Sequence, residues 1–584
     1  MSCRKHLGSG ASRTRISSAT DCTSGAVSTI LTLHDPQTAR GYYAEGLWRE
    51  DTLYSLLREH ARARPDAFAL RDSALRLNWS ELLAWVDSVA EDLHFAGVKR
   101  GQRVSVWVPS RAEAIVILLA CSRNGYVCNP SMHQNYTTGE VLELLARIES
   151  AALVAQSGYG ADAARRDIFA EAVALPAMCR VYCLQPRGKP GPWSGGDAFP
   201  PQRRAQPPSV APDLNPDKVT YLAFTSGTTG TPKGVMHSDN TLLANGRAMV
   251  RDWGHDANSV LLSLSPTSHH IANVGLAQAL VAGFEMVLND LPQGKDVTDW
   301  IAETGATYVM GVPTHAIDTL AQMRRRGLDA LGRVKTFYMA GATIPRELAA
   351  SFLALGIKPQ NVYGMTENGS HQYTLPSDDA DTIVSTCGRA CSGYEIKLWR
   401  QDDADVEVGP GEIGEIGGRG ALLTLGYFGN QSATEASFNA HGWFMSGDLG
   451  RFDANGNLEV VGRKKDLIIR GGHNIYPAHI EDLAHRHPGV SKAVAFPVAD
   501  ERLGERVCLA IIPRAEPAPS ADEMLTHLDA AGLSKYDMPE YYLVMTEFPT
   551  TASGKTLKRE LVAWARESRI QPTPCRLGGA NKSA

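Results

Sequence analysis

Short apolar runs alternate with segments of helical periodicity along most of the chain. Up to about residue 160, strand-like runs are separated by helical segments, one of which contains the continuous apolar run 114–121 and is expected to be buried. Alternating strands and helices predict parallel sheets that are covered by helices on both faces. The pattern therefore predicts an α/β fold. The strand-like runs lie at 103–108, 127–130, 152–155, 219–224, 261–265, 307–312, 336–340 and 361–363, and the helical segments begin at Leu53 or span 112–122 and 140–147.

The pattern changes after residue 400. Residues 409–420 are rich in glycine but have no βαβ unit around them, so we interpret them as turns in a β-rich subdomain. After Gly462, strand-like and helical segments alternate over about a hundred residues, which predicts a small α+β domain. The strands of this domain are expected at 466–469, 492–498, 505–512 and 541–548, and its helices at 521–531 and 556–566. We divide the chain into an N-terminal extension expected to be disordered (1–40), a large domain (41–462), a hinge (463–466), a small domain (467–570) and a tail (571–584).

A loop between two of these segments has the composition of a phosphate site. Residues 225–234 read T-S-G-T-T-G-T-P-K-G, after the apolar run 219–224 and before a helical segment that begins near Thr241. Glycines permit turns that a Cβ would forbid, and successive backbone N–H groups in such turns form a concavity for phosphate oxygens. A surface turn is the simpler alternative. A Walker A loop is excluded because Lys233 lies between Pro232 and Gly234.

Six further motifs follow this loop in a characteristic order. They are S-P-T-S-H-H (265–270), M-A-G-A-T-I-P (339–345), Y-G-M-T-E (363–367), G-W-F-M-S-G-D (442–448), G-R-K-K-D (462–466) and P-T-T-A-S-G-K (549–555). Together with the loop they resemble the motifs of the adenylate-forming superfamily, which includes acyl- and aryl-CoA ligases, luciferases and peptide-synthetase adenylation domains. The resemblance covers roughly residues 45–565.

The resemblance implies a two-step reaction. The carboxylate of an acid attacks the α-phosphorus of ATP, which gives an acyl-adenylate and expels pyrophosphate. The thiol of CoA then displaces AMP. ATP, Mg²⁺ and CoA are therefore the expected cofactor and co-substrates of an AMP-forming acid–CoA ligase.

The resemblance also assigns roles to residues at the matching positions. The phosphate loop residues would be Thr225, Ser226, Gly227, Thr228, Thr229, Gly230 and Lys233. Thr366 would bind phosphate and Glu367 would hold Mg²⁺, while Lys555 would bridge the acid and the α-phosphate. Tyr363 would stack on adenine beside the backbone of Gly341 and Ala342, and Asp448 and Arg463 would hold the ribose hydroxyls. Lys465 would be the hinge, and Gly472 would let the pantetheine chain pass. Without the resemblance, the better interpretation of Tyr363 would be a core aromatic residue, that of Glu367 a helix cap, and that of Asp448 and Arg463 surface charges.

The acid pocket is expected where strands end at the nucleotide site. The resemblance places His269, His270, Asn273, Val312, Met339 and Met365 in it, with Val274, Gly311 and Thr314 nearby. Most of these side chains are apolar or small, which favours an uncharged, compact acid. The segments 132–137 and 265–270 resemble cyclohexanecarboxylate–CoA ligases, which indicates an alicyclic, aromatic or medium-chain acid.

Other functions remain open at this point. A ligase that transfers the acyl group to a carrier protein, or an oxygenase similar to luciferase, would share these motifs. A peptide-synthetase domain is disfavoured because 266–275 contains no Asp to bind an amino group. A non-catalytic nucleotide sensor is disfavoured because Glu367, Asp448 and Lys555 are all present.

The composition narrows the possible partners and compartments. The 584 residues carry a net charge of −5, so neither nucleic acid nor a membrane surface is expected as a partner. The longest apolar run, 114–121, is shorter than the about 20 residues that span a bilayer as a helix. Ten cysteines in a chain of this length do not indicate a disulfide framework, and we expect Cys387 and Cys391 to be reduced thiols. We therefore expect a cytoplasmic enzyme.

The first 30 residues leave an alternative open. They are basic and rich in Ser and Thr, as in a mitochondrial transit peptide, so the mitochondrial matrix is the alternative compartment. A homodimer is an open expectation.

Overall fold

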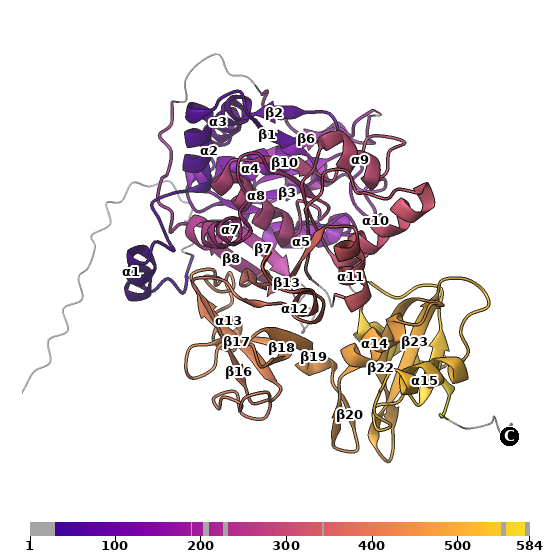
Figure 1. The fold of residues 1–584 in the computed structure, drawn as a ribbon. Coiled ribbons are helices and arrows are strands. Elements are labelled where there is room, and N and C mark those ends of the chain that lie inside the picture. Colours follow the sequence, from indigo (N-terminus) through magenta and orange to yellow (C-terminus); the bar gives the residue numbers. More distant parts are fainter. Residues whose placement is uncertain are drawn as a thin grey trace, which may run out of the picture.

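The apolar runs of the large domain form two mostly parallel sheets covered by helices. The computed structural model describes residues 30–188, 190–202, 209–225, 232–341, 344–550 and 556–577. Figure 1 shows the two sheets in the upper part of the molecule, a β-rich sheet below them and a small C-terminal domain beside it. This arrangement confirms the predicted fold class.

The first sheet carries the strand that leads into the phosphate loop. Its strand order is β6 (Arg180–Leu184), β5 (Ser150–Gln156), β3 (Arg103–Trp107), β4 (Val127–Asn129), β7 (Val219–Thr225) and β8 (Lys233–Ser238). The helices in this part of the chain are α4 (Ala112–Asn124), α5 (Thr138–Arg147) and α6 (Ile168–Ala172). All strand pairs are parallel except β7 with β8.

The pairing of β7 with β8 corrects the expected position of the phosphate loop. We predicted a strand, the loop and then a helix near Thr241, but β8 lies between the loop and α7 (Asp239–Trp253). Val235 and Met236 are buried, and Thr225 lies opposite Lys233 in the antiparallel register. The loop is therefore the connection of a β-hairpin. The helix begins two residues earlier than expected because Ser238 caps it, accepting a hydrogen bond from the backbone N–H of Thr241.

The second sheet supplies most of the strands that end at the site. Its order is β15 (Arg389–Ala390), β14 (Gly369–Tyr373), β13 (Lys358–Met365), β12 (Thr336–Met339), β11 (Tyr308–Gly311), β9 (Val260–Ser263), β10 (Glu285–Leu288), β1 (Phe68–Arg71) and β2 (Arg76–Asn78). Strands β13, β12, β11, β9, β10 and β1 run parallel. The remaining helices of this region are α1 (Pro36–Ala44), α2 (Leu53–Ala63), α3 (Trp79–Phe95), α8 (His270–Ala282), α9 (Val297–Thr304), α10 (Pro313–Arg326), α11 (Arg346–Ala354) and α12 (Ala380–Ser385).

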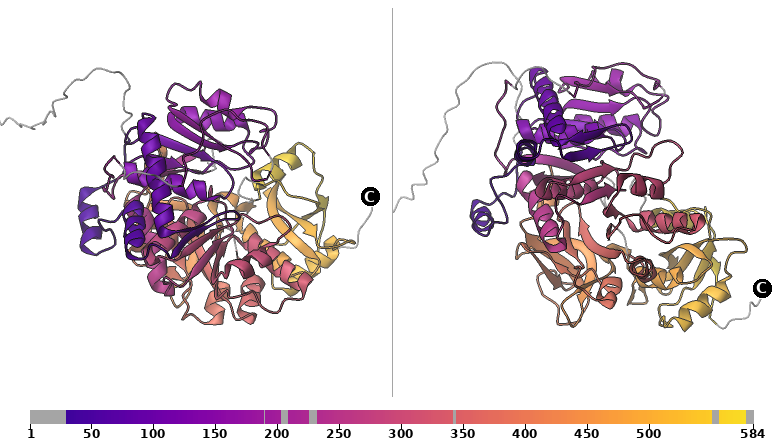
Figure 2. Two further views of the ribbon diagram at one scale, coloured as in Figure 1. Left: turned by 90° about the horizontal axis from the view of Figure 1, so that it is seen from above. Right: turned by 45° about the horizontal axis from the view of Figure 1, so that its top comes forward.

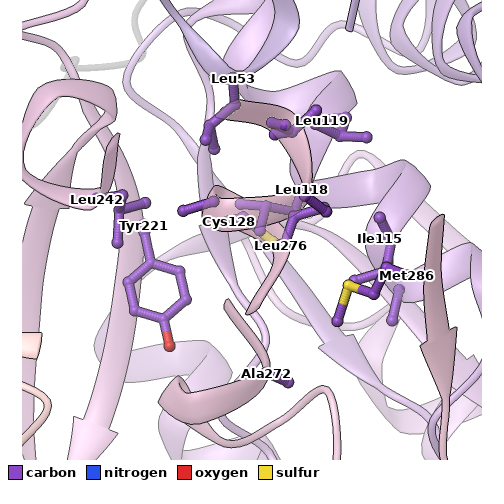
Figure 3. Close-up of a cluster of buried hydrophobic side chains, with 14 of the residues drawn as sticks. Leu53, Ile115, Leu118, Leu119, Cys128, Tyr221, Leu242, Ala272, Leu276 and Met286 are labelled. Carbon is purple, nitrogen blue, oxygen red and sulfur yellow. The ribbon is translucent and has the colours of Figure 1, made fainter. Parts of the chain in front are cut away.

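Helix α4 forms the centre of the core between the two sheets. All thirteen of its residues are buried, in agreement with the continuous apolar run 114–121 at its centre. Figure 3 shows Ile115 of α4 beside Met286 of β10, and Leu118 near Leu276 of α8. Cys128 and Tyr221, from the first sheet, belong to the same apolar cluster. The core therefore fixes both sheets, and the strand ends of each, in one position relative to the other.

Residues 409–420 lie in a β-rich sheet as expected, but only 409–413 form a turn, because 414–420 are the strand β17. The antiparallel order of this sheet is β16 (Tyr394–Trp399), β17 (Gly414–Gly420), β18 (Phe444–Phe452) and β19 (Leu458–Arg463), with α13 (Gln431–Glu435) between β17 and β18 in the chain. The short 3₁₀ helix η1 (Lys464–Asp466) follows β19 and leads into the small domain.

The small domain is an α+β unit that begins with a tight hairpin. Figure 2 shows it as a separate lobe beside the large domain. Its sheet has the order β21 (His473–Ile475), β20 (Ile468–Arg470), β23 (Gly504–Pro513), β24 (Tyr541–Val544) and β25 (Thr573–Pro574), and β22 (Val490–Asp500) also pairs with β23. Its helices are α14 (Pro477–His485), α15 (Ala521–Ala530) and α16 (Lys558–Arg566). Our sequence interpretation missed β21, whose hairpin turns at Gly471 and Gly472 with φ of +57° and +85°.

The ends of the described chain are more structured than we expected. Helix α1 begins at Pro36, inside the segment assigned to the N-terminal extension, and the backbone N–H of Leu33 bonds to the carbonyl of Leu425 at 2.9 Å. At the other end, β25 pairs with β24, so the sheet of the small domain continues past residue 570. Residues 1–29 lie outside the described residues. Among the helices that the structure describes, none has the length and apolar character needed to cross a membrane.

Candidate active site

A cavity of about 560 Å³ lies where the second sheet, the β-rich sheet and the hinge meet. The carboxyl ends of β12 and β13 open into it, as expected for ligand sites of parallel sheets. In Figure 1 this position lies between β13 above and β18 and β19 below. The predicted site residues that line it are Thr225, Lys233, His269, His270, Gly341, Met365, Thr366, Glu367, Asp448, Arg463 and Lys465.

Glu367 follows β13 and lies beside Lys233 at one end of the cavity. The Tyr427 hydroxyl donates to Glu367 Oε1 at 3.0 Å, and Lys233 Nζ lies 4.6 Å from the centre of the Tyr427 ring. Burial raises the pKa of Glu367, while the hydrogen bond from Tyr427 and the charge of Lys233 act in the opposite direction. A buried carboxylate next to a lysine suits a site that binds both a cation and phosphate.

The surroundings of Glu367 fit Mg²⁺ rather than a metal enclosed by protein ligands. Among the described residues there is no group of three His, Cys, Asp or Glu side chains that could hold a metal ion. Magnesium is usually bound by one or two carboxylates together with phosphates and waters, so a single carboxylate is sufficient.

Asp448 and Arg463 face each other at the other end of the cavity. They are register partners on the antiparallel strands β18 and β19, and Arg463 Nε lies 3.0 Å from Asp448 Oδ1. The Tyr363 hydroxyl donates to Asp448 Oδ2 at 3.0 Å. Each oxygen of the carboxylate therefore has a donor, which fixes its orientation. An Asp held in this way can accept hydrogen bonds from a pair of neighbouring hydroxyls.

Tyr363 lies deeper than its proposed contact with adenine suggests. Its side chain packs with Leu398, Ile416 and Leu458, and its ring meets that of His371 edge-on at 5.3 Å. Tyr363 is not among the described residues that line the cavity. The structure thus shows Tyr363 orienting Asp448, and stacking on adenine stays a prediction.

The sequence interpretation missed His237, which fixes the backbone of Thr366. His237 Nε2 donates to the carbonyl oxygen of Thr366 at 2.6 Å, and its Nδ1 lies 3.0 Å from Thr241 Oγ1. Burial lowers the pKa of His237 to about 4, so the ring is neutral at physiological pH. The sequence feature that could have indicated this role is the position of His237 in an apolar run directly after the phosphate loop.

His270 is held in position by two residues behind it. Asn273 Nδ2 donates to the Tyr221 hydroxyl at 3.2 Å, and that hydroxyl lies 3.3 Å from His270 Nδ1. Burial and the neighbouring His237 and His269 lower the pKa of His270, so the ring is neutral at physiological pH. Asn273, expected in the pocket, instead supports His270 from behind.

Three other predicted residues are not among the described residues that line the cavity. Met339 packs in the core with Leu262 and Phe337, because side chains alternate along β12 and its neighbour Tyr338 occupies the cavity side. Val312 precedes α10, and its Cγ1 would lie 3.6 Å from a Cβ placed on Gly341. Gly472, in the turn of the β20–β21 hairpin, is not among the described lining residues.

Some predicted residues cannot be placed. Ser226, Gly227, Thr228, Thr229, Gly230, Ala342 and Lys555 lie outside the described residues.

The hinge forms the wall of the cavity opposite the second sheet. Lys464 Nζ lies 2.8 Å from Glu415 Oε2, and Lys465 lines the cavity. Burial lowers the pKa of Lys465, and the charges of Arg463 and, more weakly, of Arg559 lower it further. Since Arg559 belongs to α16, the start of this small-domain helix lies near the hinge.

Comparison with known proteins agrees with this geometry. The family model described as AMP-binding enzyme matches residues 57–428, and the model of the AMP-binding enzyme C-terminal domain matches residues 479–555. The chain belongs to the AMP-binding enzyme family. The resemblance predicted from the motifs is thereby confirmed.

Individual relatives match over nearly their whole length. The medium-chain fatty-acid–CoA ligase of Escherichia coli is 29% identical, over 90% of this chain and 93% of the relative. The salicylyl-CoA synthase / salicylate adenylyltransferase of a Streptomyces species is 31% identical, over 90% of this chain and 96% of the relative. The o-succinylbenzoate–CoA synthetase of Bacillus subtilis, solved with its acyl-adenylate intermediate, superimposes with a TM-score of 0.73 at 25% identity, covering 87% of this chain and 97% of the other. The prediction of an acid–CoA ligase activity is confirmed by these relatives together with the family.

Proposed function

We propose that the chain activates a compact monocarboxylic acid with ATP and transfers the acyl group to CoA. The observation that carries this proposal is the cavity itself. It joins a lysine and a buried carboxylate at one end, an Asp–Arg pair at another and a largely apolar wall beside them. A nucleotide and a small acid thus have chemically matching places within reach of each other.

The residues of the cavity divide the work of adenylation. Lys233 supports the negative phosphates, Asp448 and Arg463 hold the ribose hydroxyls, and His237 keeps the backbone of Thr366 in place. Mg²⁺, when bound at Glu367, would neutralise phosphate charge as pyrophosphate leaves. Lys555 would contact the reacting carboxylate and the α-phosphate. Fixed charges of this kind stabilise the transition state because they need no reorganisation during the reaction.

The acid end of the cavity favours a compact acyl body. Ile271 and Val274 of α8, Ala340 after β12 and Met365 of β13 form its apolar lining. Two of the relatives named above act on a medium-chain fatty acid and on salicylate, which supports an aromatic, alicyclic or medium-chain acid for this chain. Cyclohexanecarboxylate is the alicyclic candidate.

The acid is identified by a series of kcat/KM values. We expect benzoate, cyclohexanecarboxylate and hexanoate to support ATP–pyrophosphate exchange better than acetate or palmitate. Neighbouring acids should overlap, because one buried methylene is worth only about 1–3 kcal/mol in such pockets. A wide margin for acetate or palmitate would contradict the compact pocket. Exchange without formation of a CoA thioester would favour a carrier protein as the acceptor, and no exchange with any acid would favour a nucleotide sensor.

We also propose a cytoplasmic location. The acidic net charge of −5 and the eight described free cysteines are compatible with a reducing compartment. Import of the full-length chain into isolated mitochondria with removal of the first residues would contradict this location. Sedimentation of the purified protein would show whether it forms the expected homodimer.

A further inference from the structure

Two buried hydroxyl groups line the acid end of the cavity and contact each other. Tyr338 of β12 is 1% exposed and Ser370 of β14 is 4% exposed, and both belong to the cavity wall. Tyr338 Oη lies 2.7 Å from Ser370 Oγ. Ile271 and Val274 of α8 contribute apolar groups to the same wall. The pair is thus a polar feature in a mainly apolar part of the cavity.

The hydroxyl pair carries one hydrogen that is not used in the hydrogen bond between its two oxygens. Two hydroxyls carry two hydrogens, and the hydrogen bond between them uses one. Neither oxygen has another hydrogen-bond partner within the part of the chain that the structure describes. Burial raises the pKa of Tyr338, so its phenol stays protonated. Among the described residues, one O–H group of the pair therefore has no acceptor, and leaving a buried donor unpaired is unfavourable.

The position of this pair is fixed by contacts behind it. Asn245 of α7 donates from Nδ2 to the carbonyl of Ser370 at 2.9 Å and accepts from the Ser370 backbone N–H at Oδ1, at 2.8 Å. Tyr338 and Ser370 are both buried, and Tyr338 extends from a strand in the middle of the parallel sheet. The hydroxyls are therefore held before any ligand binds, as a recognition site requires.

We propose that the Tyr338–Ser370 hydroxyl pair recognises an oxygen substituent on the acid. The preferred substrates are compact acids that carry a hydroxyl, ether or carbonyl oxygen away from the reacting carboxylate. This inference rests on the proposed function, because it concerns the same cavity. A site that hydrogen-bonds a substituent rejects an analogue without it more strongly than an apolar pocket separates acids that differ by one methylene.

The test compares acids that differ by a single hydroxyl. ATP–pyrophosphate exchange is measured for benzoate and for 2-, 3- and 4-hydroxybenzoate with the full-length enzyme. We expect kcat/KM of at least one hydroxybenzoate to exceed that of benzoate by roughly 10–100-fold, the effect of pairing one buried donor. In the double variant Tyr338→Phe/Ser370→Ala this ratio should fall to about 1, and one of the two single variants should account for most of the fall.

A matched control separates recognition from stability. Tyr308 of β11 is equally buried and donates to Gln360 Oε1 at 2.8 Å, but it is not among the described lining residues. Tyr308→Phe should keep the preference for the hydroxybenzoate. The proposal would be overturned if kcat/KM for benzoate equals that for every hydroxybenzoate, or if the preference persists in the double variant. Either result would leave the assignment as an acid ligase intact. If the double variant does not fold, the two single variants decide, because a preference unchanged in both also overturns it. Absence of exchange with all acids would instead reject the proposed function and this inference with it.

Discussion

The two walls of the cavity are held in different ways. On the large-domain wall, Glu367 and Asp448 are less than a tenth exposed, and tyrosine hydroxyls fix both carboxylates. On the hinge wall, the side chains of Arg463 and Lys464 are 44% and 40% exposed, and they reach the large domain through ion pairs. Their carboxylate partners, Asp448 and Glu415, are each only 8% exposed, so each pair joins a half-exposed cation to a buried anion. We predict that the buried carboxylates keep their positions, whereas the chain turns at residues 463–466.

The small domain should nevertheless supply the largest single contribution to catalysis. We predict that Lys555→Ala lowers the adenylation rate by about 10²–10³-fold, the usual cost of losing one charged contact in a transition state. Conversion of supplied acyl-adenylate to the thioester should be unaffected, because the lysine is needed in the first step. Measuring the two half-reactions separately checks this.

The control for this variant is a lysine on the same domain that is remote from the motif. Lys535 is exposed, so Lys535→Ala should leave both half-reactions unchanged. Normal adenylation by Lys555→Ala would show that the small domain does not contribute the predicted charge.

The second prediction tests whether the hinge wall has to move. Lys465→Pro should leave adenylation within a fewfold of normal and slow thioester formation by about 10²-fold, the scale of a misplaced reacting group. Proline fixes φ near the value of a 3₁₀ helix, so η1 can form but cannot rotate at this residue. Lys465→Ala removes the same charge without restricting φ and should spare the thioester step. Equal losses in both half-reactions with Lys465→Pro would contradict a rotating hinge.

The sequence predicted the fold well where the pattern was local. Helix α4 was recognised from its continuous apolar run, 114–121, and the strand-like runs 336–340 and 361–363 fall on β12 and β13. The β20–β21 hairpin was missed because its strands have three residues each, too few to show alternation. Strand β8 was missed because its first two residues, Lys233 and Gly234, belong to the phosphate motif. Only Val235 and Met236 then continue as an apolar run.

Only residues that belong to a sequence motif could be assigned to the site in advance. Glu367, Asp448 and Arg463 were placed in one cavity by resemblance alone, and the structure brings them together. The orientation of side chains was not predictable. We predicted Met339 rather than Tyr338 in the acid pocket because the sequence does not show which face of the sheet each residue occupies. A shift of one residue along a strand places the side chain on the opposite face. Supporting contacts such as those of His237 and Tyr427 join segments more than fifty residues apart and leave no local signal.

The third prediction concerns the fixed wall. Glu367→Gln keeps the shape of the side chain and its contact with the Tyr427 hydroxyl, but it removes the charge that attracts Mg²⁺. We expect the Mg²⁺ concentration for half-maximal adenylation to rise roughly 10-fold or more, as when the coordination of a metal site is weakened. A titration of the exchange rate with Mg²⁺ measures this. Glu435→Gln, at an exposed position of α13, is the control, and an unchanged metal requirement would assign the metal to another group.

The smallest expected effect lies at the contact between the domains. Arg486, which follows α14 in the small domain, has its Nε 3.4 Å from Oε1 of Glu347 in α11 of the large domain, and the Glu347 side chain is 55% exposed. Since such a pair contributes about 0–1 kcal/mol, Glu347→Gln should change each half-reaction by no more than about fivefold. The two half-reactions should shift in opposite directions, because the pair stabilises one arrangement of the domains at the expense of the other. The shifts should disappear at high salt, where an exposed pair is screened. A double-mutant cycle with Arg486→Gln isolates the interaction, and a coupling well above 1 kcal/mol would mean that the hinge wall is held as firmly as the wall formed by Glu367 and Asp448.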